Sequence, residues 1–234
     1  MRRAGHGVRI TSAITTTIIS LVGFAFVDDT DLFCTNTPGE DLSTTFQAAL
    51  DRWAGGLRAT GGALSPAKSF CYLIDFQWSG NKWNYISVSD LPGEFTLTNS
   101  QGGRSPLTRY EPSHAEKTLG VYISMDGNEE EEIKYLTQKC IQFGAKMKAS
   151  TCTKNEAIYA FTTSLLSSLE YALPVTNLTE SQWEKILSPA LIPSLHKAGV
   201  SKSIPRASLY GPAKFQGFNI QHPYYSQQIK HITT

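Results

Sequence analysis

The chain lacks the motifs that mark several common enzyme sites. Its four cysteines are far apart with no C-x-x-C pair, and its five histidines include no H-x-x-x-H pair. Zinc is therefore unsupported, and we expect the thiols to be free and buried. No G-x-S-x-G elbow, P-loop or dinucleotide fingerprint is present. The absence of these motifs argues against serine hydrolases and the common nucleotide-binding enzymes.

Charge is also scarce. Charged residues make up 18% of the 234-residue chain, and 21 Lys and Arg against 20 Asp and Glu give a net charge of +1. The balance changes along the chain, because residues 1–132 hold 10 basic and 16 acidic side chains, whereas residues 133–234 hold 11 basic and 4 acidic ones. An acidic first part is therefore followed by a basic part suited to contact with phosphates.

A long hydrophobic run is missing too. The main candidate, residues 13–26, has 14 residues, short of the roughly 20 that span a bilayer. The run is rich in Thr and Ile and ends without a small-x-small cleavage site. We therefore expect no membrane partner and an intracellular location, in the cytoplasm or nucleus. The alternative is a secreted protein that uses residues 13–26 as its leader.

The apolar pattern of the first part predicts both strands and a helix. Two apolar runs flank the acidic residues 28–31, which predicts a hairpin with the acids at its turn. Asp41 is a candidate N-cap of a helix whose apolar side chains recur every three or four positions up to the glycines at 61–62. Further strands are predicted at 69–76, 83–88, 94–98 and 117–124, with a hairpin turn at 79–82.

The pattern becomes helical after residue 128. A helix is predicted at 129–148, because glutamates open it and lysines close it, as the helix dipole favours. Two more are predicted at 155–172 and at 179–187, the latter capped by Thr179 and followed by Pro189. We therefore place a domain boundary near residue 128, where the charge balance also changes.

The acidic hairpin has a candidate chemical role. Adjacent carboxylates repel one another, so such a pair usually has a compensating cation. Two magnesium ions about 3.5 to 4 Å apart, held by hard oxygen ligands, catalyse nucleotidyl transfer. Asp28 and Asp29 are therefore candidate Mg²⁺ ligands. The alternative is that Asp28, Asp29 and Asp31 only form the turn.

Four segments carry a resemblance to a known family. Phe26-Val27-Asp28-Asp29 resembles the aromatic-x-Asp-Asp box of reverse transcriptases. Residues 61–69, a glycine-bearing turn with Lys68, look like the family's next motif. Residues 117–121, Lys-Thr-Leu-Gly-Val, are similar to the Leu-Gly strand of the primer grip, and residues 209–218 resemble a segment after the thumb. The resemblance covers nearly the whole chain from about Gly5.

This resemblance implies an α+β fold with two parts. Residues 1–128 are expected to be a partial polymerase palm, in which an antiparallel sheet carries the Asp-Asp hairpin and packs against a helix. Residues 129–234 are expected to be a helical, thumb-like region. The implied activity is that of a retroelement's RNA-directed DNA polymerase, with Mg²⁺ as cofactor and an RNA/DNA template-primer as partner.

The resemblance also implies residue roles. Asp28 becomes the principal metal ligand, and Asp29 supports the second ion or the hairpin geometry. Lys68 lies near the pyrophosphate or the incoming triphosphate, where a cation stabilises negative charge. Leu119 and Gly120 lie against the primer strand. Each of these last three residues has a plain alternative, as a solvated lysine or as ordinary β structure.

The chain lacks one part of this machinery. No Asp or Glu precedes Asp28, so the upstream palm carboxylate and the fingers are missing from it. One or two Asp ligands cannot hold two magnesium ions against their hydration. We therefore expect that the isolated chain does not polymerise, and that a second chain supplying the missing palm half is a candidate partner.

The alternative function is a non-catalytic nucleic-acid-binding module. The candidate phosphate contacts in the basic part are Lys134, Lys139, Lys146, Lys148 and Lys154. Lysines dispersed through helices are otherwise a solvated face.

Overall fold

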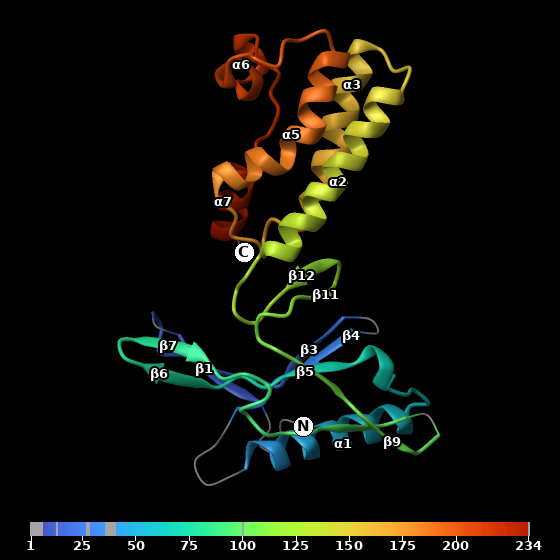
Figure 1. The fold of residues 1–234 in the computed structure, drawn as a ribbon, viewed down its shortest axis with the longest axis vertical. Coiled ribbons are helices and arrows are strands. Elements are labelled where there is room, and N and C mark those ends of the chain that lie inside the picture. The colour runs from blue at the N-terminus through green and yellow to red at the C-terminus, as the bar shows by residue number, and fades with distance from the viewer. Residues whose placement is uncertain (1–6, 13, 27–28, 36–40, 100, 234) are drawn as a thin grey trace. The chain divides into compact units, whose positions relative to one another are not determined.

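Short two-stranded sheets and helices build a mixed α+β fold (Figure 1). The computed structural model describes the chain except residues 1–6, 13, 27–28, 36–40, 100 and 234. It divides into two compact units, Met1–His114 and Ala115–Thr234. The division precedes the expected boundary near residue 128, so the segment 117–124, which we expected in the first part as a strand, belongs to the helical unit.

The described strands of the first unit pair two by two. β1–β2, β3–β4, β6–β7 and β8–β9 are antiparallel, whereas β5 and β10 pair in parallel. We expected one antiparallel sheet, and the described strands instead form separate two-stranded ladders. The strands are β1 (Val8–Thr11), β2 (Ile18–Leu21), β3 (Gly23–Phe26), β4 (Asp29–Leu32), β5 (Phe70–Tyr72), β6 (Phe76–Ser79), β7 (Lys82–Tyr85), β8 (Thr96–Thr98), β9 (Arg104–Pro106) and β10 (Thr108–Tyr110).

The acidic hairpin is confirmed as β3–β4, with one difference. Phe26 pairs with Asp29, and Phe24 pairs with Asp31. Asp29 and Asp31 therefore lie within a strand rather than at the turn. Asp28 lies outside the described residues. The hairpin predicted around residues 79–82 is confirmed as β6–β7, in which Gly80 has a φ of 63°.

The predicted helix of the first unit is confirmed as α1 (Leu42–Ala59). The Asp41 side chain caps it by accepting a hydrogen bond of 2.9 Å from the Thr44 backbone N–H. The buried face of α1 contributes Leu50 to a small core with Cys71, Phe95, Leu97 and Leu107. After α1 comes the 3-10 turn η2 (Pro66–Lys68), which leads into β5.

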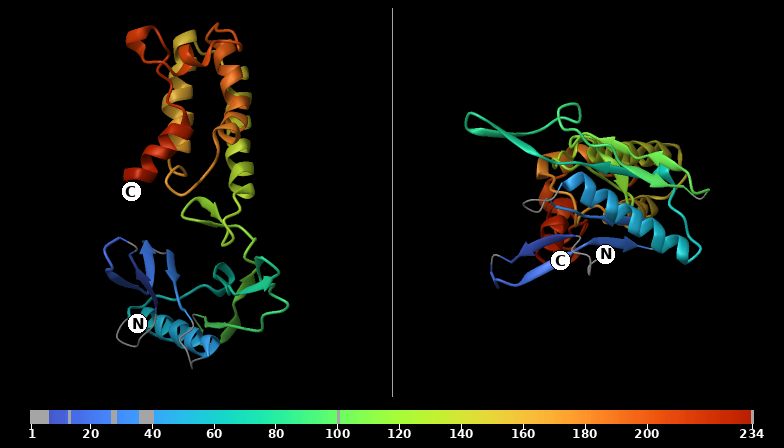
Figure 2. Two further views of the ribbon diagram at one scale, coloured as in Figure 1. Left: turned by 90° about the vertical axis from the view of Figure 1, so that its left-hand side faces the viewer. Right: turned by 90° about the horizontal axis from the view of Figure 1, so that it is seen from below.

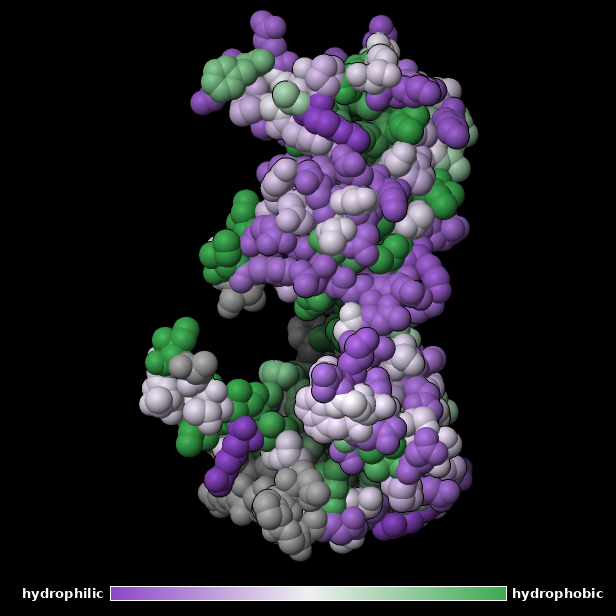
Figure 3. Space-filling view, turned by 60° about the vertical axis from the view of Figure 1, so that its left-hand side comes forward, coloured by the Kyte–Doolittle hydropathy of each residue, from purple (hydrophilic) through white to green (hydrophobic). Residues whose placement is uncertain are grey.

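Many apolar side chains of the first unit remain exposed. Ile18, Phe24 and Trp78 are exposed by 63%, 60% and 74%. Hydrophobic side chains correspondingly reach the surface of this unit in the space-filling view (Figure 3). A sheet of only two strands buries little of either face, which explains why few of its apolar side chains enter a core.

The second unit is a β-hairpin followed by helices. In Figures 1 and 2 the helices α2, α3 and α5 run side by side. No helix of the described residues combines the length and apolarity needed to cross a bilayer. The elements are β11 (Glu116–Thr118), β12 (Val121–Ile123), α2 (Glu130–Ala149), α3 (Lys154–Ala160), the π-helix η3 (Phe161–Leu166), α4 (Ser167–Leu169), α5 (Glu180–Lys197), α6 (Arg206–Tyr210), the 3-10 turn η4 (Ala213–Phe215) and α7 (Pro223–Thr233).

Two sequence predictions are wrong in this unit. The strand expected at 117–124 is the hairpin β11–β12, because the backbone reverses at Leu119 and Gly120. The helix expected to end at 187 continues to Lys197 through Pro189 and Pro193. Both prolines lie in a helix with a buried face, and burial of that face outweighs the lost backbone hydrogen bonds. The Thr179 cap is confirmed.

The core of the second unit is large and closely packed. It contains eighteen buried apolar side chains, of which Trp183 is the largest. Gly144 of α2 faces the Pro189 carbonyl of α5, and a Cβ built there would lie 2.1 Å from that oxygen. The missing side chain therefore lets the two helices approach closely. Cys71 and Cys140 are buried free thiols as predicted, whereas Cys34 and Cys152 are half-buried.

Candidate nucleic-acid interface

The hairpin β11–β12 presents an exposed two-residue turn. Lys117 pairs with Tyr122, and Thr118 pairs with Val121. The turn residues Leu119 and Gly120 have φ values of 49° and 92°. Two successive left-handed residues are the signature of a type I′ turn, which matches the twist of a hairpin. Leu119 is 40% exposed at the tip.

A buried carboxylate attaches this hairpin to α2. The Tyr122 backbone N–H donates a 2.8 Å hydrogen bond to Glu132 Oε2. Glu132 is 1% exposed, and its Oε1 has no hydrogen-bond partner in the described part of the chain. Burial raises the pKa of Glu132, and the hydrogen bond from Tyr122 and the charges of Lys139 and Lys117 offset part of that rise.

Two lysines share one aromatic ring beside this anchor. The ammonium nitrogen of Lys117 lies 4.3 Å from the ring centroid of Tyr135, and that of Lys139 lies 5.5 Å from it. Both distances are within the range of cation–π attraction. Lys117 also lies 5.6 Å from the ring of Tyr122, which is itself 5.6 Å from the ring of Tyr135. Strand and helix thus bring two cations and two rings together.

The cluster continues onto α4 and the segment after it. Lys139 Nζ donates a 2.9 Å hydrogen bond to the Ser168 carbonyl. Three residues further on, the ring of Tyr171 lies against Gly120, where a Cβ would be 3.4 Å from Cε1. Tyr171 is 62% exposed. The set Lys117, Leu119, Gly120, Tyr122, Tyr135, Lys139 and Tyr171 is called the hairpin platform below.

The lysines predicted on α2 are not gathered in one place. Lys134 forms an ion pair of 2.7 Å with Glu131, one helical turn earlier. Lys146 lies seven residues after Lys139, which places it on the same side of the helix as the hairpin platform. Lys148 lies on another side, and both of these lysines are exposed. Only Lys146 therefore extends the platform along α2.

The residues predicted for catalysis belong to the first unit. Asp29 and Asp31 lie on one face of β4, because side chains alternate along a strand. Partial burial and, secondly, the negative charge of Asp29 raise the pKa of Asp31. Lys68 is exposed at the end of η2. Within the described residues, no hydrogen bond or ion pair joins Lys68 to either carboxylate.

These carboxylates do not fit a two-magnesium centre. No group of three His, Cys, Asp or Glu side chains that could hold a metal ion occurs among the described residues, and Asp28 lies outside them. Two described carboxylates are too few to hold two magnesium ions against their hydration.

The sequence pattern missed part of the platform. Tyr122 and Tyr135 come together with Lys117 only through the hairpin register and the packing against α2. The spacing of Tyr135 and Lys139 by four residues was a visible signal, since such residues share a helix face.

Comparison of the chain with protein-family models, curated proteins and solved structures finds no match.

Proposed function

We propose that this chain binds nucleic acid through the hairpin platform of its second unit. The observation that carries the proposal is the arrangement of Lys117 and Lys139 around the ring of Tyr135. Two cations held beside half-buried rings, with the exposed ring of Tyr171 close by, suit a phosphodiester strand. Its phosphates would contact the lysines, and its bases would stack on the exposed ring.

Charge supports this assignment. A lysine ammonium has three donors, and Lys139 uses one of them for the Ser168 carbonyl. Its other donors and those of Lys117 remain available to phosphate oxygens. Lys146 continues the positive charge along the same side of α2, which fits a ligand with regularly repeated charges.

Aromatic exposure supports it as well. Tyr171 is 62% exposed, and its ring lies beside Gly120 at the hairpin turn. A base stacked on such a ring gains about 1 to 3 kcal/mol. Gly120 is required by its left-handed backbone, with a φ of 92°, because a Cβ at this position would make only an ordinary contact with the Tyr171 ring.

The test is a salt titration of binding to fluorescent duplex and single-stranded oligonucleotides. For the unmodified chain we expect log K to fall linearly with log salt concentration. In the variant Lys117→Gln/Lys139→Gln the slope should be smaller by about 1.8 units on duplex DNA, or about 1.4 on a single strand, since each phosphate contact contributes about 0.9 or 0.7.

Lys134→Gln is the matched control, because it removes one charge from α2 at a lysine already paired with Glu131. For this control, the slope of log K against log salt concentration should stay close to that of the unmodified chain. Absence of binding at low salt, or equal slopes for the double variant and the unmodified chain, would show that the proposal is wrong.

A relationship to reverse transcriptases is proposed as the origin of this binding. The observation that favours it is the order of elements: an Asp-bearing antiparallel hairpin, a helix with a glycine turn, a Leu-Gly hairpin and basic helices. In this proposal an RNA/DNA template-primer is the natural ligand. A second chain that covers the exposed apolar strands of the first unit is the proposed protein partner, and the isolated chain has no polymerase activity.

A further inference from the structure

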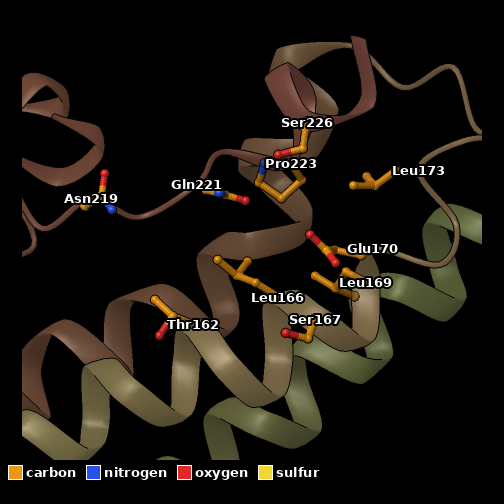
Figure 4. Close-up of a pocket in the computed structure, with 10 residues that line it drawn as sticks. All are labelled: Thr162, Leu166, Ser167, Leu169, Glu170, Leu173, Asn219, Gln221, Pro223 and Ser226. Atoms are coloured by element: carbon orange, nitrogen blue, oxygen red, sulfur yellow. The ribbon is translucent and has the colours of Figure 1, made fainter. Parts of the chain in front are cut away.

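A small polar pocket lies next to the hairpin platform. It has a volume of about 220 Å³ and is formed by η3, α4 and the segment that leads into α7. Leucines and a proline make its floor, and carboxylate, amide and hydroxyl groups surround it (Figure 4). The lining residues used below are Leu166, Ser167, Leu169, Glu170, Gln221 and Ser226.

Two polar side chains at the mouth of this pocket, those of Glu170 and Gln221, are exposed to solvent and can therefore reach a ligand. In Figure 4 the carboxylate of Glu170 and the amide of Gln221 point into the same space from two different segments. Among the described residues, neither side chain has a hydrogen bond or ion pair. Glu170 is the only charged residue of the lining, so the pocket favours hydrogen-bond donors and disfavours phosphate.

The pocket and the platform share one short stretch of chain. Ser167 and Glu170 line the pocket, whereas Ser168 and Tyr171 belong to or contact the platform. Neighbouring Cα atoms are only about 3.8 Å apart, so a strand bound on the platform passes close to the pocket. A nucleotide that is not base-paired can turn its base away from the strand and into such a pocket.

We propose that this pocket receives one unpaired guanine from a nucleic-acid strand bound on the hairpin platform, an inference that rests on the proposed function. Unpaired bases are commonly read on their Watson–Crick edges. Guanine is the base whose edge offers two adjacent donors, N1–H and the N2 amino group, and an ionised carboxylate such as Glu170 can accept both. The Gln221 amide can donate to guanine O6, and the leucines of the floor cover the ring face.

Other bases fit this donor set less well. Adenine and cytosine place a ring-nitrogen acceptor beside their amino group, and a carboxylate is repelled by it. Uracil and thymine place one N–H between two carbonyls. The pocket is also smaller than the roughly 300 to 1,000 Å³ of a typical small-molecule site, so it suits one base and not a larger ligand.

The experiment compares duplexes that differ in one single-nucleotide bulge: guanine, inosine, adenine, cytosine or thymine. Inosine is guanine's matched analogue because it lacks only the N2 amino group. For the unmodified chain we expect the guanine bulge to bind on the order of tenfold more tightly than the others, since one specific base contact gives a preference of this size. In Glu170→Gln the preference of guanine over inosine should disappear.

Glu94→Gln is the control for charge, because Glu94 is an exposed carboxylate of the first unit. It should leave the ratio of guanine to inosine binding unchanged. Equal binding of all five bulges with a steep salt dependence would overturn the guanine pocket and leave the proposed function standing. Failure of every duplex to bind would overturn both. A preference for guanine that survives in Glu170→Gln would also overturn the pocket.

Discussion

At the scale of single residues, Glu132 is the clearest case of a buried charge with a structural task. It is 1% exposed and joins hairpin to helix through the Tyr122 N–H. Burial raises its pKa, whereas Lys139 and Lys117 act in the opposite direction. The two lysines therefore stabilise the ionised form of Glu132 and are also the proposed phosphate contacts. Both of them lie over the ring of Tyr135.

The raised pKa predicts how Glu132 affects stability against pH. Because the folded state holds this proton more tightly than the unfolded state, the contribution of Glu132 to the free energy of unfolding is largest below the unfolded pKa, about 4.3. It declines as pH rises through the folded pKa. Urea unfolding between pH 4 and 7 should therefore show the unmodified chain losing stability relative to Glu132→Gln as pH rises.

A second substitution separates charge from hydrogen bonding at this position. Glu132→Ala leaves the Tyr122 N–H without its partner and should cost about 1 to 3 kcal/mol at every pH. If the difference between the unmodified chain and Glu132→Gln does not change with pH, the carboxylate does not titrate differently in the folded state.

At the scale of elements, the close approach of α2 and α5 organises the second unit. Gly144 faces the Pro189 carbonyl, and both helices contribute to the same core. Gly144 costs helix propensity relative to alanine, about 0.5 to 1 kcal/mol. The close packing of α2 and α5 that it allows outweighs this cost.

Gly144→Ala should therefore destabilise the protein by about 3 kcal/mol, the upper end for overpacking, because backbone atoms must move to admit the Cβ. Gly56→Ala in α1 is the matched control, since a Cβ there meets nothing within 4 Å. The control should stabilise the protein by about 0.5 to 1 kcal/mol. Urea midpoints measure both effects, and equal shifts in the two variants would contradict the observed helix approach.

At the scale of the whole molecule, the two units differ greatly in core size. Among the described residues, eighteen buried apolar side chains form the core of the second unit, whereas five form that of the first. Stability on folding grows with the apolar area removed from water. The second unit should therefore be the more stable one and should not need the first in order to fold.

We expect the fragment 115–234 to unfold cooperatively in urea, with a midpoint equal to that of the later transition of the full chain. Circular dichroism at 222 nm measures the unfolding of the fragment and of the full chain. Fragment 1–114 exposes much of its apolar surface and should associate as its concentration rises, which analytical ultracentrifugation detects. A disordered 115–234 fragment would show that its core depends on the first unit.

Much of the local structure follows from the sequence. Asp41 and Thr179 are good caps because their side chains can accept a backbone N–H, and both helices begin where these residues predict. The hairpins β3–β4 and β6–β7 follow from turn residues between apolar runs. The prediction of one strand at 117–124 was wrong because a type I′ turn needs two residues with positive φ. Gly120 is a usual residue for such a turn, but Leu119 is not, so nothing in the sequence indicated a turn there.

The sequence by itself determined where α1, α2 and α5 begin, where the caps Asp41 and Thr179 lie, and that the second part is basic, because these properties depend on neighbouring residues. Tertiary structure decided what those residues can do together. Packing of β11–β12 on α2 places Lys117, Tyr135 and Lys139 in contact, and the segment after α4 brings Tyr171 to Gly120. Such contacts join residues distant in sequence, so their geometry comes from the packed core and not from local propensity.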